Sequence, residues 1–257
     1  MSLYGLVLAL GSISAYCIMR FFIGRFCSIR KELFSVDILF VVLVIFGIIG
    51  GRTLFVFYNL PYFFEYPWEI PAIWHGGWVW HGALIGGGLA LFVYAKLKRI
   101  SFFFLADFLV PGLALAQSIG RWGNYFNQEL YGLPTNVPWA IFIDETNRVP
   151  GFESYARFHP TFLYESLWDF CLFILLFILV RSMYKRSNNR LTNMIGGSIF
   201  AWYLILYSVG RFFIEFLRID PVPVIAGFRI PQLFSIAFVF LGAYILLWDL
   251  QRRKKMI

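Results

Sequence analysis

The sequence predicts an all-α polytopic membrane protein with seven transmembrane helices, its N-terminus outside and its C-terminus in the cytoplasm. Of its 257 residues, 60% are hydrophobic and only 14% are charged, whereas soluble domains carry about 25% charged residues. Apolar runs long enough to cross a bilayer recur along the chain, and basic residues gather in alternate connections between them. These observations exclude a secreted mini-protein, a coiled coil and a disordered chain.

Seven apolar runs are close to the roughly 20 residues that a helix needs to cross the hydrocarbon core with its backbone bonds satisfied internally. They fall at about 3–19, 36–58, 79–95, 102–120, 162–180, 194–217 and 231–249. The first run lacks a basic leader and a small-residue cleavage site, so we expect a retained span and not a cleaved signal peptide. We expect one transmembrane domain over 1–257, with an extracytoplasmic cap over 122–160 between the fourth and fifth spans.

Fifteen of the 22 basic residues lie in alternate connections, and the positive-inside rule places these in the cytoplasm. The four basic segments are 20–31, 96–99, 181–190 and 252–255. The other basic residues are all arginines of the outer half: Arg52, Arg121, Arg148, Arg157, Arg211, Arg218 and Arg229. An arginine fork grips phosphate or carboxylate in two places, which favours anion recognition. Ion pairing near a membrane surface is the alternative.

Polar clusters in apolar spans are candidates for function, because ionisable groups in a membrane usually face a cavity. The first cluster, at 74–82, reads Trp-His-Gly-Gly-Trp-Val-Trp-His-Gly and leads into the third span. Its His81 is a candidate proton acceptor. Tight helix packing is the alternative for this glycine-rich segment. The fourth span ends in Gly-Arg-Trp-Gly-Asn-Tyr-Phe-Asn-Gln-Glu-Leu-Tyr-Gly at 120–132, where Arg121 and Asn124 share a helical face. A helix end alone does not require so many hydrogen-bonding groups.

The third cluster surrounds the start of the fifth span. It contains Arg-Phe-His-Pro-Thr-Phe-Leu-Tyr-Glu at 157–165, and we expect Pro160 to begin the helix. Glu165 and Asp169 follow four residues apart in an apolar stretch. Helix capping explains the proline and threonine but not two acids facing the membrane.

The fourth cluster is a polar stripe on the sixth span. Tyr207, Arg211, Glu215 and Arg218 recur at i, i+4, i+8 and i+11, which places them on one helical face. The structural alternative is a self-neutralised pair of Arg211 and Glu215, which would leave Arg218 without a partner. Arg148 and Arg229 lie outside all four clusters, so we expect lysine to be tolerated at both positions.

The sequence indicates no metal, no cofactor and no nucleic acid. Cys17, Cys27 and Cys171 lie far apart in or beside apolar segments, without a C-x-x-C or other ligand spacing. The net charge of +8 follows from the membrane topology, because the excess of basic residues sits in the cytoplasmic connections.

These motifs resemble those of the phosphatidylglycerol–prolipoprotein diacylglyceryl transferase family, whose members begin the maturation of bacterial lipoproteins. The run at 120–132 matches the family frame Gly-Arg-x-Gly-Asn-x-x-Asn-x-Glu-x-x-Gly. The motifs at 81–82, 159–165 and 210–216 are similar to its other blocks, and Tyr4-Gly5 and Gly50-Gly51-Arg52 to smaller elements. The likeness covers essentially the whole chain.

The resemblance implies a transferase of the bacterial cytoplasmic (inner) membrane with its site on the extracytoplasmic side. It would move the sn-1,2-diacylglyceryl group from phosphatidylglycerol to the lipobox cysteine of a preprolipoprotein, and release glycerol 1-phosphate. By analogy His81 removes the thiol proton, while Arg121 and Arg211 stabilise the leaving phosphate. The implied substrate-binding residues, besides Arg121, are Tyr4, Arg52, Asn124, Asn127, Glu129, Gly132, His159, Glu165, Tyr207, Glu215 and Arg218.

A membrane transporter for an anionic solute is the competing interpretation, with the outer arginines lining its path. Two features of the sequence argue against it. The charges gather at the outer ends of the spans and not at the midplane, and we find no repeat symmetry.

Overall fold

The computed structural model describes residues 3–26, 35–186 and 196–255. It divides into two compact units, one formed by Met1–Phe22 with Asp107–Ile257 and the other by Ile23–Ala106. The basic segments at 20–31 and 181–190 lie partly outside the described residues, and Cys27 lies wholly outside them. We describe each unit by itself.

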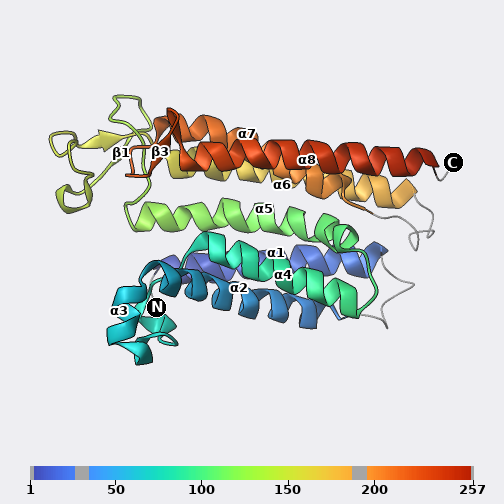
Figure 1. The fold of residues 1–257 in the computed structure, drawn as a ribbon. Helices are drawn as coiled ribbons and strands as arrows, with labels where there is room; N and C mark the ends of the chain where they lie inside the picture. Colours follow the sequence, from blue (N-terminus) through green and yellow to red (C-terminus); the bar gives the residue numbers. More distant parts are fainter. Residues whose placement is uncertain (1–2, 27–34, 187–195, 256–257) are drawn as a thin grey trace. The chain divides into compact units, whose positions relative to one another are not determined.

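Helices form at all seven apolar runs, so the all-α prediction is confirmed (Figure 1). They are α1 (Leu3–Phe26), α2 (Val36–Tyr58), α4 (Trp80–Leu97), α5 (Phe102–Phe126), α6 (Thr161–Arg186), α7 (Ser198–Ile214) and α8 (Ile230–Lys255). Shorter helical elements are α3 (Leu60–Glu65), η2 (Pro67–Glu69), η3 (Ile73–His75), η4 (Glu145–Asn147) and η6 (Glu215–Leu217). Two small hairpins pair β1 (Ile141–Phe142) with β2 (Arg157–Phe158) and β3 (Val224–Ile225) with β4 (Phe228–Arg229).

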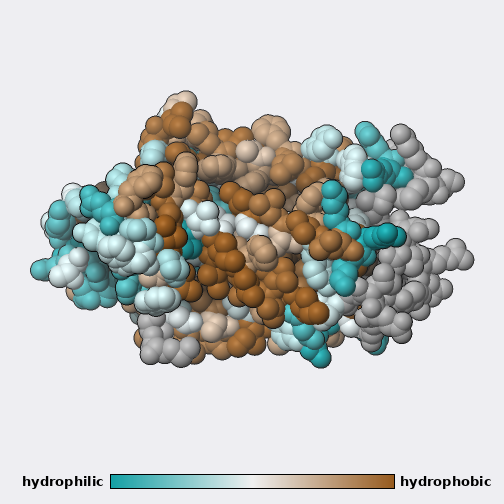
Figure 2. All heavy atoms as spheres, turned by 60° about the horizontal axis from the view of Figure 1, so that its bottom comes forward, coloured by the Kyte–Doolittle hydropathy of each residue, from teal (hydrophilic) through white to brown (hydrophobic). Residues whose placement is uncertain are grey.

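Within the described residues, six helices are long and apolar enough to cross a membrane, as expected of a polytopic membrane protein. These spans are Leu3–Arg25, Val36–Tyr58, Phe102–Phe126, Thr161–Met183, Ser198–Leu217 and Ile230–Arg252. The remaining helix, α4, has 18 residues, and its four glycines, His81 and Lys96 lower its hydropathy. The seventh span therefore stays a prediction. Figure 2 shows hydrophobic side chains over the middle of the helices and hydrophilic ones at the cap, which matches a lipid-facing belt.

In the larger unit, the polar motifs of α5, α6 and α7 all lie at the same end of the helices. The end of α5, the start of α6, the end of α7 and the start of α8 lie beside the two hairpins (Figure 1). The ends of α6 and α8 that carry basic residues lie at the opposite end. Helix α5 continues to Phe126, which puts Arg121 and Asn124 on its last two turns, as their shared helical face requires.

A buried acid fixes the other end of α7. The side-chain oxygens of Asp107, on α5, accept hydrogen bonds from the backbone N–H groups of Gly197 at 2.7 Å and Phe200 at 2.8 Å. These donors belong to the first turn of α7, where N–H groups have no partner within the helix and a negative charge is favourable. Asp107 is completely buried and replaces a local capping side chain.

In the smaller unit, glycines bring α2 and α4 into close contact. A Cβ on Gly82 would lie 2.3 Å from the carbonyl oxygen of Gly50, and one on Gly86 would lie 2.2 Å from that of Phe46. Backbone approaches this close leave no room for a larger residue. The packing alternative for the glycine-rich third run is therefore part of the structure.

Candidate functional site

The polar residues at the cap end converge on the carboxylate of Glu165, in the second turn of α6. Nε of Arg121, from α5, lies 2.7 Å from Glu165 Oε2. Arg211 of α7 donates to Oε1 at 2.6 Å, and Arg218, just after η6, donates to the same oxygen at 3.2 Å. Three guanidinium groups from three segments therefore share one carboxylate, whose side chain is only 5% exposed.

A second carboxylate, Glu215, extends these contacts to the β3–β4 hairpin. Its Oε2 lies 2.5 Å from Nη2 of Arg211, and its Oε1 accepts a 2.7 Å hydrogen bond from Nε of Arg229. Asp220 accepts from Nε of Arg218 at 2.7 Å and lies 3.4 Å from Nη2 of Arg229. We call this group the arginine–carboxylate network: Arg121, Glu165, Arg211, Glu215, Arg218, Asp220 and Arg229.

The two acids of α6 point into the protein, so the expectation that they face the membrane is wrong. Glu165 and Asp169 expose only 4% and 2% of their surface. Asp169 interacts electrostatically with Arg121 and Glu165, and Arg121 also interacts with the side chain of Tyr207. With Asp169 included, four carboxylates face four guanidinium groups. When all are ionised, the assembled charges cancel.

Two expectations about the arginines are corrected by these contacts. The pair of Arg211 and Glu215 does form, but it does not leave Arg218 alone, because Arg218 bonds to Glu165 and Asp220. Arg229 does not stand outside the clusters, because its guanidinium group is bonded to Glu215. Sequence distance concealed this contact, since the hairpin brings Arg229 back to the end of α7.

A smaller constellation forms where α5 ends. The amide nitrogen of Asn124 donates to Oε1 of Glu129 at 2.9 Å, and that of Asn127 reaches the same oxygen at 3.4 Å. The residues on either side of Glu129 have positive φ values of 50° and 56°, which turn the chain back over the helix end. Tyr4 of α1 packs here, because a Cβ on Gly123 would lie 2.6 Å from its ring. Four predicted residues are thus brought together.

Gly132 connects the polar motifs through its backbone. Its N–H donates to the carbonyl of His159 at 2.9 Å, and it pairs with Arg218 in an isolated antiparallel bridge. A Cβ at this position would lie 2.9 Å from the carbonyl oxygen of Leu217, so any larger residue would displace the backbone. His159 places Nδ1 3.0 Å from the hydroxyl of Tyr164 and does not bond directly to the network in any contact of the described residues.

Arg52 and His81 belong to the smaller unit. The guanidinium group of Arg52 donates to four backbone carbonyls of the loop after α3, at 2.5 to 3.0 Å, and lies over the rings of Phe55 and Phe63. Those carbonyls belong to Glu69, Ile70, Gly76 and Gly77. Arg52 therefore holds this loop to α2. His81 lies in the first turn of α4 and is exposed.

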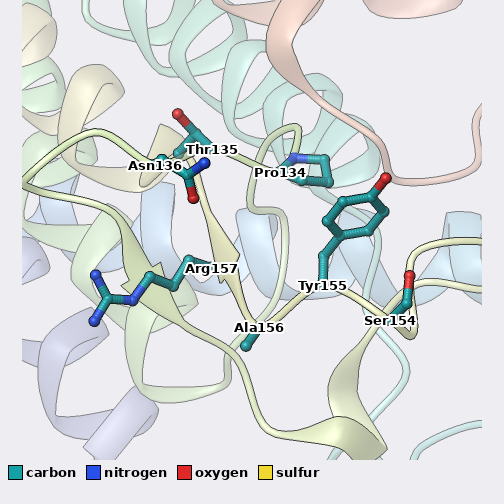
Figure 3. Close-up of a pocket in the computed structure, with 7 residues that line it drawn as sticks. All are labelled: Pro134, Thr135, Asn136, Ser154, Tyr155, Ala156 and Arg157. Carbon is teal, nitrogen blue, oxygen red and sulfur yellow. The ribbon is translucent and has the colours of Figure 1, made fainter.

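The cap has its own small core around Tyr131, Ile143 and Phe158. Burial raises the pKa of Tyr131, although a hydrogen bond from the N–H of Val149 and the charge of Arg148 act in the opposite direction. Beside this core is a pocket of about 380 Å³ (Figure 3). Its lining residues are Pro134, Thr135, Asn136, Ser154, Tyr155, Ala156 and Arg157. None of them belongs to the network or to the expected substrate-binding residues, so the pocket and the network have no residue in common.

Comparison with protein-family models matches residues 1–248 to the family described as prolipoprotein diacylglyceryl transferase. The chain belongs to this family. The resemblance drawn from the motifs is thereby confirmed, and membership of a diacylglyceryl transferase family does not favour the transporter alternative.

Curated relatives of this diacylglyceryl transferase family member carry the name phosphatidylglycerol–prolipoprotein diacylglyceryl transferase. The one from Prochlorococcus marinus is 42% identical over 181 residues, which are 68% of this chain and 58% of the relative. The one from Fervidobacterium nodosum is 41% identical over 202 residues, 78% of this chain and 65% of the relative. The one from Gloeobacter violaceus is 46% identical over 172 residues, 66% of this chain and 60% of the relative. The chain spans less than two thirds of the length of these relatives.

Three residues of this family member have structural roles that sequence reasoning missed: Arg229, Asp220 and Asp107. Asp220 follows Arg218 by two residues, and this short spacing was a usable signal for the ion pair between them. Nothing in the sequence separates Asp107 from any other acid near the end of a span, because its partners lie 90 and 93 residues away. Among the described residues, no group of three or more His, Cys, Asp or Glu side chains is placed to hold a metal ion.

Proposed function

We propose that this chain transfers the sn-1,2-diacylglyceryl group of phosphatidylglycerol to the lipobox cysteine of a preprolipoprotein. The names of its relatives supply the donor and the acceptor. The observation that carries the proposal is the convergence of Arg121, Arg211 and Arg218 on one buried carboxylate. A phosphodiester has the same single charge and the same paired oxygens as that carboxylate, so guanidinium forks arranged for one suit the other.

The reaction forms one carbon–sulfur bond and breaks one carbon–oxygen bond. The cysteine sulfur attacks the glyceryl carbon that carries the phosphate, and the electron pair of the broken bond remains on the phosphate oxygen. Glycerol 1-phosphate leaves, and a thioether remains on the protein substrate. His81 accepts the thiol proton as the proposed general base, because the thiolate is the reactive form of cysteine. The sulfur arrives with the substrate, since Cys17 and Cys171 lie outside the network.

In this proposal Arg121 and Arg211 stabilise the negative charge that develops on the leaving phosphate. Arg211 is held on both sides, by Glu165 and by Glu215, so its guanidinium plane is fixed before the substrate arrives. Such preorganised donors are effective because they need no reorientation during the reaction. The phosphate shares these donors with Glu165 and adds one negative charge to the network while the substrate is bound.

The constellation at the end of α5 is proposed to hold the glycerol headgroup. Asn124 and Asn127 place amide groups at the carboxylate of Glu129, which gives donors and acceptors within one small area. Neutral hydroxyl groups such as those of glycerol need such mixed partners, whereas a phosphate needs donors alone. Tyr4 borders the same place, and Tyr207 connects to it through Arg121.

We further propose seven spans in the bacterial inner membrane, with the N-terminus outside and the cap of 122–160 on the extracytoplasmic side. The support is the separation within the larger unit, where the network and the basic ends of α6 and α8 occupy opposite ends of the helices. Reporter fusions are expected to place 96–99 in the cytoplasm and 134–150 outside. The opposite labelling would contradict both the topology and the location of the site.

The transfer itself is tested with the purified full chain in lipid nanodiscs, labelled phosphatidylglycerol and a lipobox peptide. We expect a peptide heavier by one diacylglyceryl group, together with one glycerol 1-phosphate per modified peptide. A peptide with serine in place of the lipobox cysteine is the control and is expected to remain unmodified. A folded protein that moves an anionic solute across vesicles but yields neither product would contradict the transferase and support the transporter.

A further inference from the structure

We propose that Arg229 is a positioning residue, which orients Arg211 by fixing the carboxylate of Glu215 that lies between them. The inference rests on the proposed transfer reaction, because Arg211 matters only if it acts on the leaving phosphate. It goes beyond the sequence motifs, because Arg229 lies in the β3–β4 hairpin. This position is 11 residues after Arg218, where the polar stripe of the sixth span ends.

All three nitrogens of the Arg229 guanidinium group have partners from the segment that follows α7. Nε donates to Oε1 of Glu215 at 2.7 Å. Nη1 donates to the carbonyl of Arg218 at 2.9 Å, and Nη2 donates to the carbonyl of Asp220 at 2.8 Å. The planar fork thus connects one carboxylate to two backbone groups, a pattern that the single charge of lysine cannot reproduce.

The backbone of Arg229 is itself held in place by the first turn of α8. The backbone N–H of Arg229 donates to Oε1 of Gln232 at 3.0 Å, and Gln232, in the first turn of α8, is only 3% exposed. The hairpin is therefore fastened to the start of a long helix. Because the hairpin is fixed in this way, the guanidinium group of Arg229 is held beside Glu215, the first residue of η6.

Glu215 transmits that position to Arg211. It is completely buried, and its two oxygens contact different arginines: Oε1 lies 2.7 Å from Arg229 and Oε2 lies 2.5 Å from Arg211. Glu215 is also the first residue of η6, a three-residue helical turn that follows directly on α7. Oε1 accepts a hydrogen bond from Arg229, whereas the contacts of Oε2 with Arg211 and, at 3.9 Å, with Arg218 are ion pairs without hydrogen-bond geometry. In this proposal the hydrogen bond from Arg229 sets the orientation of the carboxylate. Without Arg229, the carboxylate of Glu215 can rotate, and Arg211 then loses one of the two carboxylates that hold its guanidinium group.

The test measures transfer kinetics for R229M, R229K, E215Q and the double variant E215Q/R229M. We expect R229M to lower kcat roughly 10- to 100-fold, with KM for phosphatidylglycerol changed less than about twofold, because hydrogen bonds to charged groups are strong. R229K keeps a cation facing Glu215 and is expected to retain an intermediate kcat. R181M is the matched control, since Arg181 is exposed near the end of α6 that lies opposite the network, and it is expected to match the wild type.

The double variant separates positioning from general destabilisation. If Arg229 acts through Glu215, then E215Q/R229M is no slower than E215Q alone. The reason is that E215Q already removes the carboxylate through which Arg229 would orient Arg211. Multiplicative losses in the double variant would overturn the proposal, and so would a kcat within twofold of wild type for R229M. If R229M does not fold, R229K decides: an unchanged kcat overturns the proposal and a reduced one supports it. A wild type without transfer activity would instead refute the proposed function, and these outcomes are distinguishable within one assay.

Discussion

Replacing Glu165 by glutamine tests whether the network depends on a buried negative charge at its centre. Glu165 contacts three guanidinium groups, at 2.7, 2.6 and 3.2 Å, and its side chain is 5% exposed. Glutamine has almost the same shape, but it carries no charge and turns one acceptor into a donor that faces a guanidinium group. Removing one partner from a buried ion pair costs about 3–5 kcal/mol, because the opposite charge stays buried without compensation. For a chain of this size that corresponds to a fall in Tm of about 6–20 °C.

Thermal unfolding of Glu165→Gln in detergent can be followed by the fluorescence of the nine tryptophans. Glu145→Gln is the matched control, because Glu145 pairs with Arg148 at 3.8 Å while its side chain is 88% exposed. An exposed pair contributes about 0–1 kcal/mol, so the control is expected to lower Tm by less than about 4 °C. Added glycerol phosphate is expected to restore more stability to Glu165→Gln than to the wild type, since it supplies the missing anion. A Tm within about 2 °C of wild type for Glu165→Gln would refute the central role of this carboxylate.

Three further outcomes are expected. Arg121→Lys and Arg211→Lys each lower kcat/KM about 10²–10³-fold in the transfer assay despite keeping the charge, because the fork is lost; near-normal turnover would exclude a phosphate clamp. His81→Gln slows transfer about 10²–10⁴-fold, and raising the pH partly rescues it but not Arg121→Lys; equal slowness at every pH would exclude a general base. Asp107→Asn lowers Tm by about 2–12 °C, since the α7 cap is worth about 1–3 kcal/mol, while kcat stays the same; a lowered kcat with unchanged Tm would contradict a purely structural cap.

The helices could be predicted closely from the sequence because each apolar run forms a helix with local hydrogen bonds. The expected run at 36–58 coincides with α2 at both ends. The expected run at 102–120 ended six residues before α5 does, because only the apolar residues set its limit and residues from 122 on were assigned to the cap. In the structure those residues continue the helix, since their side chains have partners at the cap end.

The members of the site could be predicted only in part. Spacing on one helix placed Arg211 and Glu215 together correctly, because residues four apart face the same side. The pairing of Glu165 with three arginines joins positions 44 to 53 residues apart and depends on how helices pack, which no local pattern contains. Arg229 was misjudged for the same reason. Its role follows from a hairpin with positive φ at Ala226 and Gly227, which turns the chain back toward η6.

The charge balance of the network limits how it can recognise an anion. The four guanidinium groups face the three carboxylates of the network and that of Asp169, so most of their positive charge is compensated and long-range steering of a free anion contributes little. Binding must then come from directed hydrogen bonds, which require a ligand whose oxygens match the positions that Glu165 now occupies. A phosphodiester that carries glycerol hydroxyls can meet the guanidinium forks and the amides of Asn124 and Asn127 at once, whereas chloride or inorganic phosphate meets only the forks. Under the proposed function, a network with compensated charges therefore favours a lipid headgroup delivered from the membrane over small anions in the surrounding water.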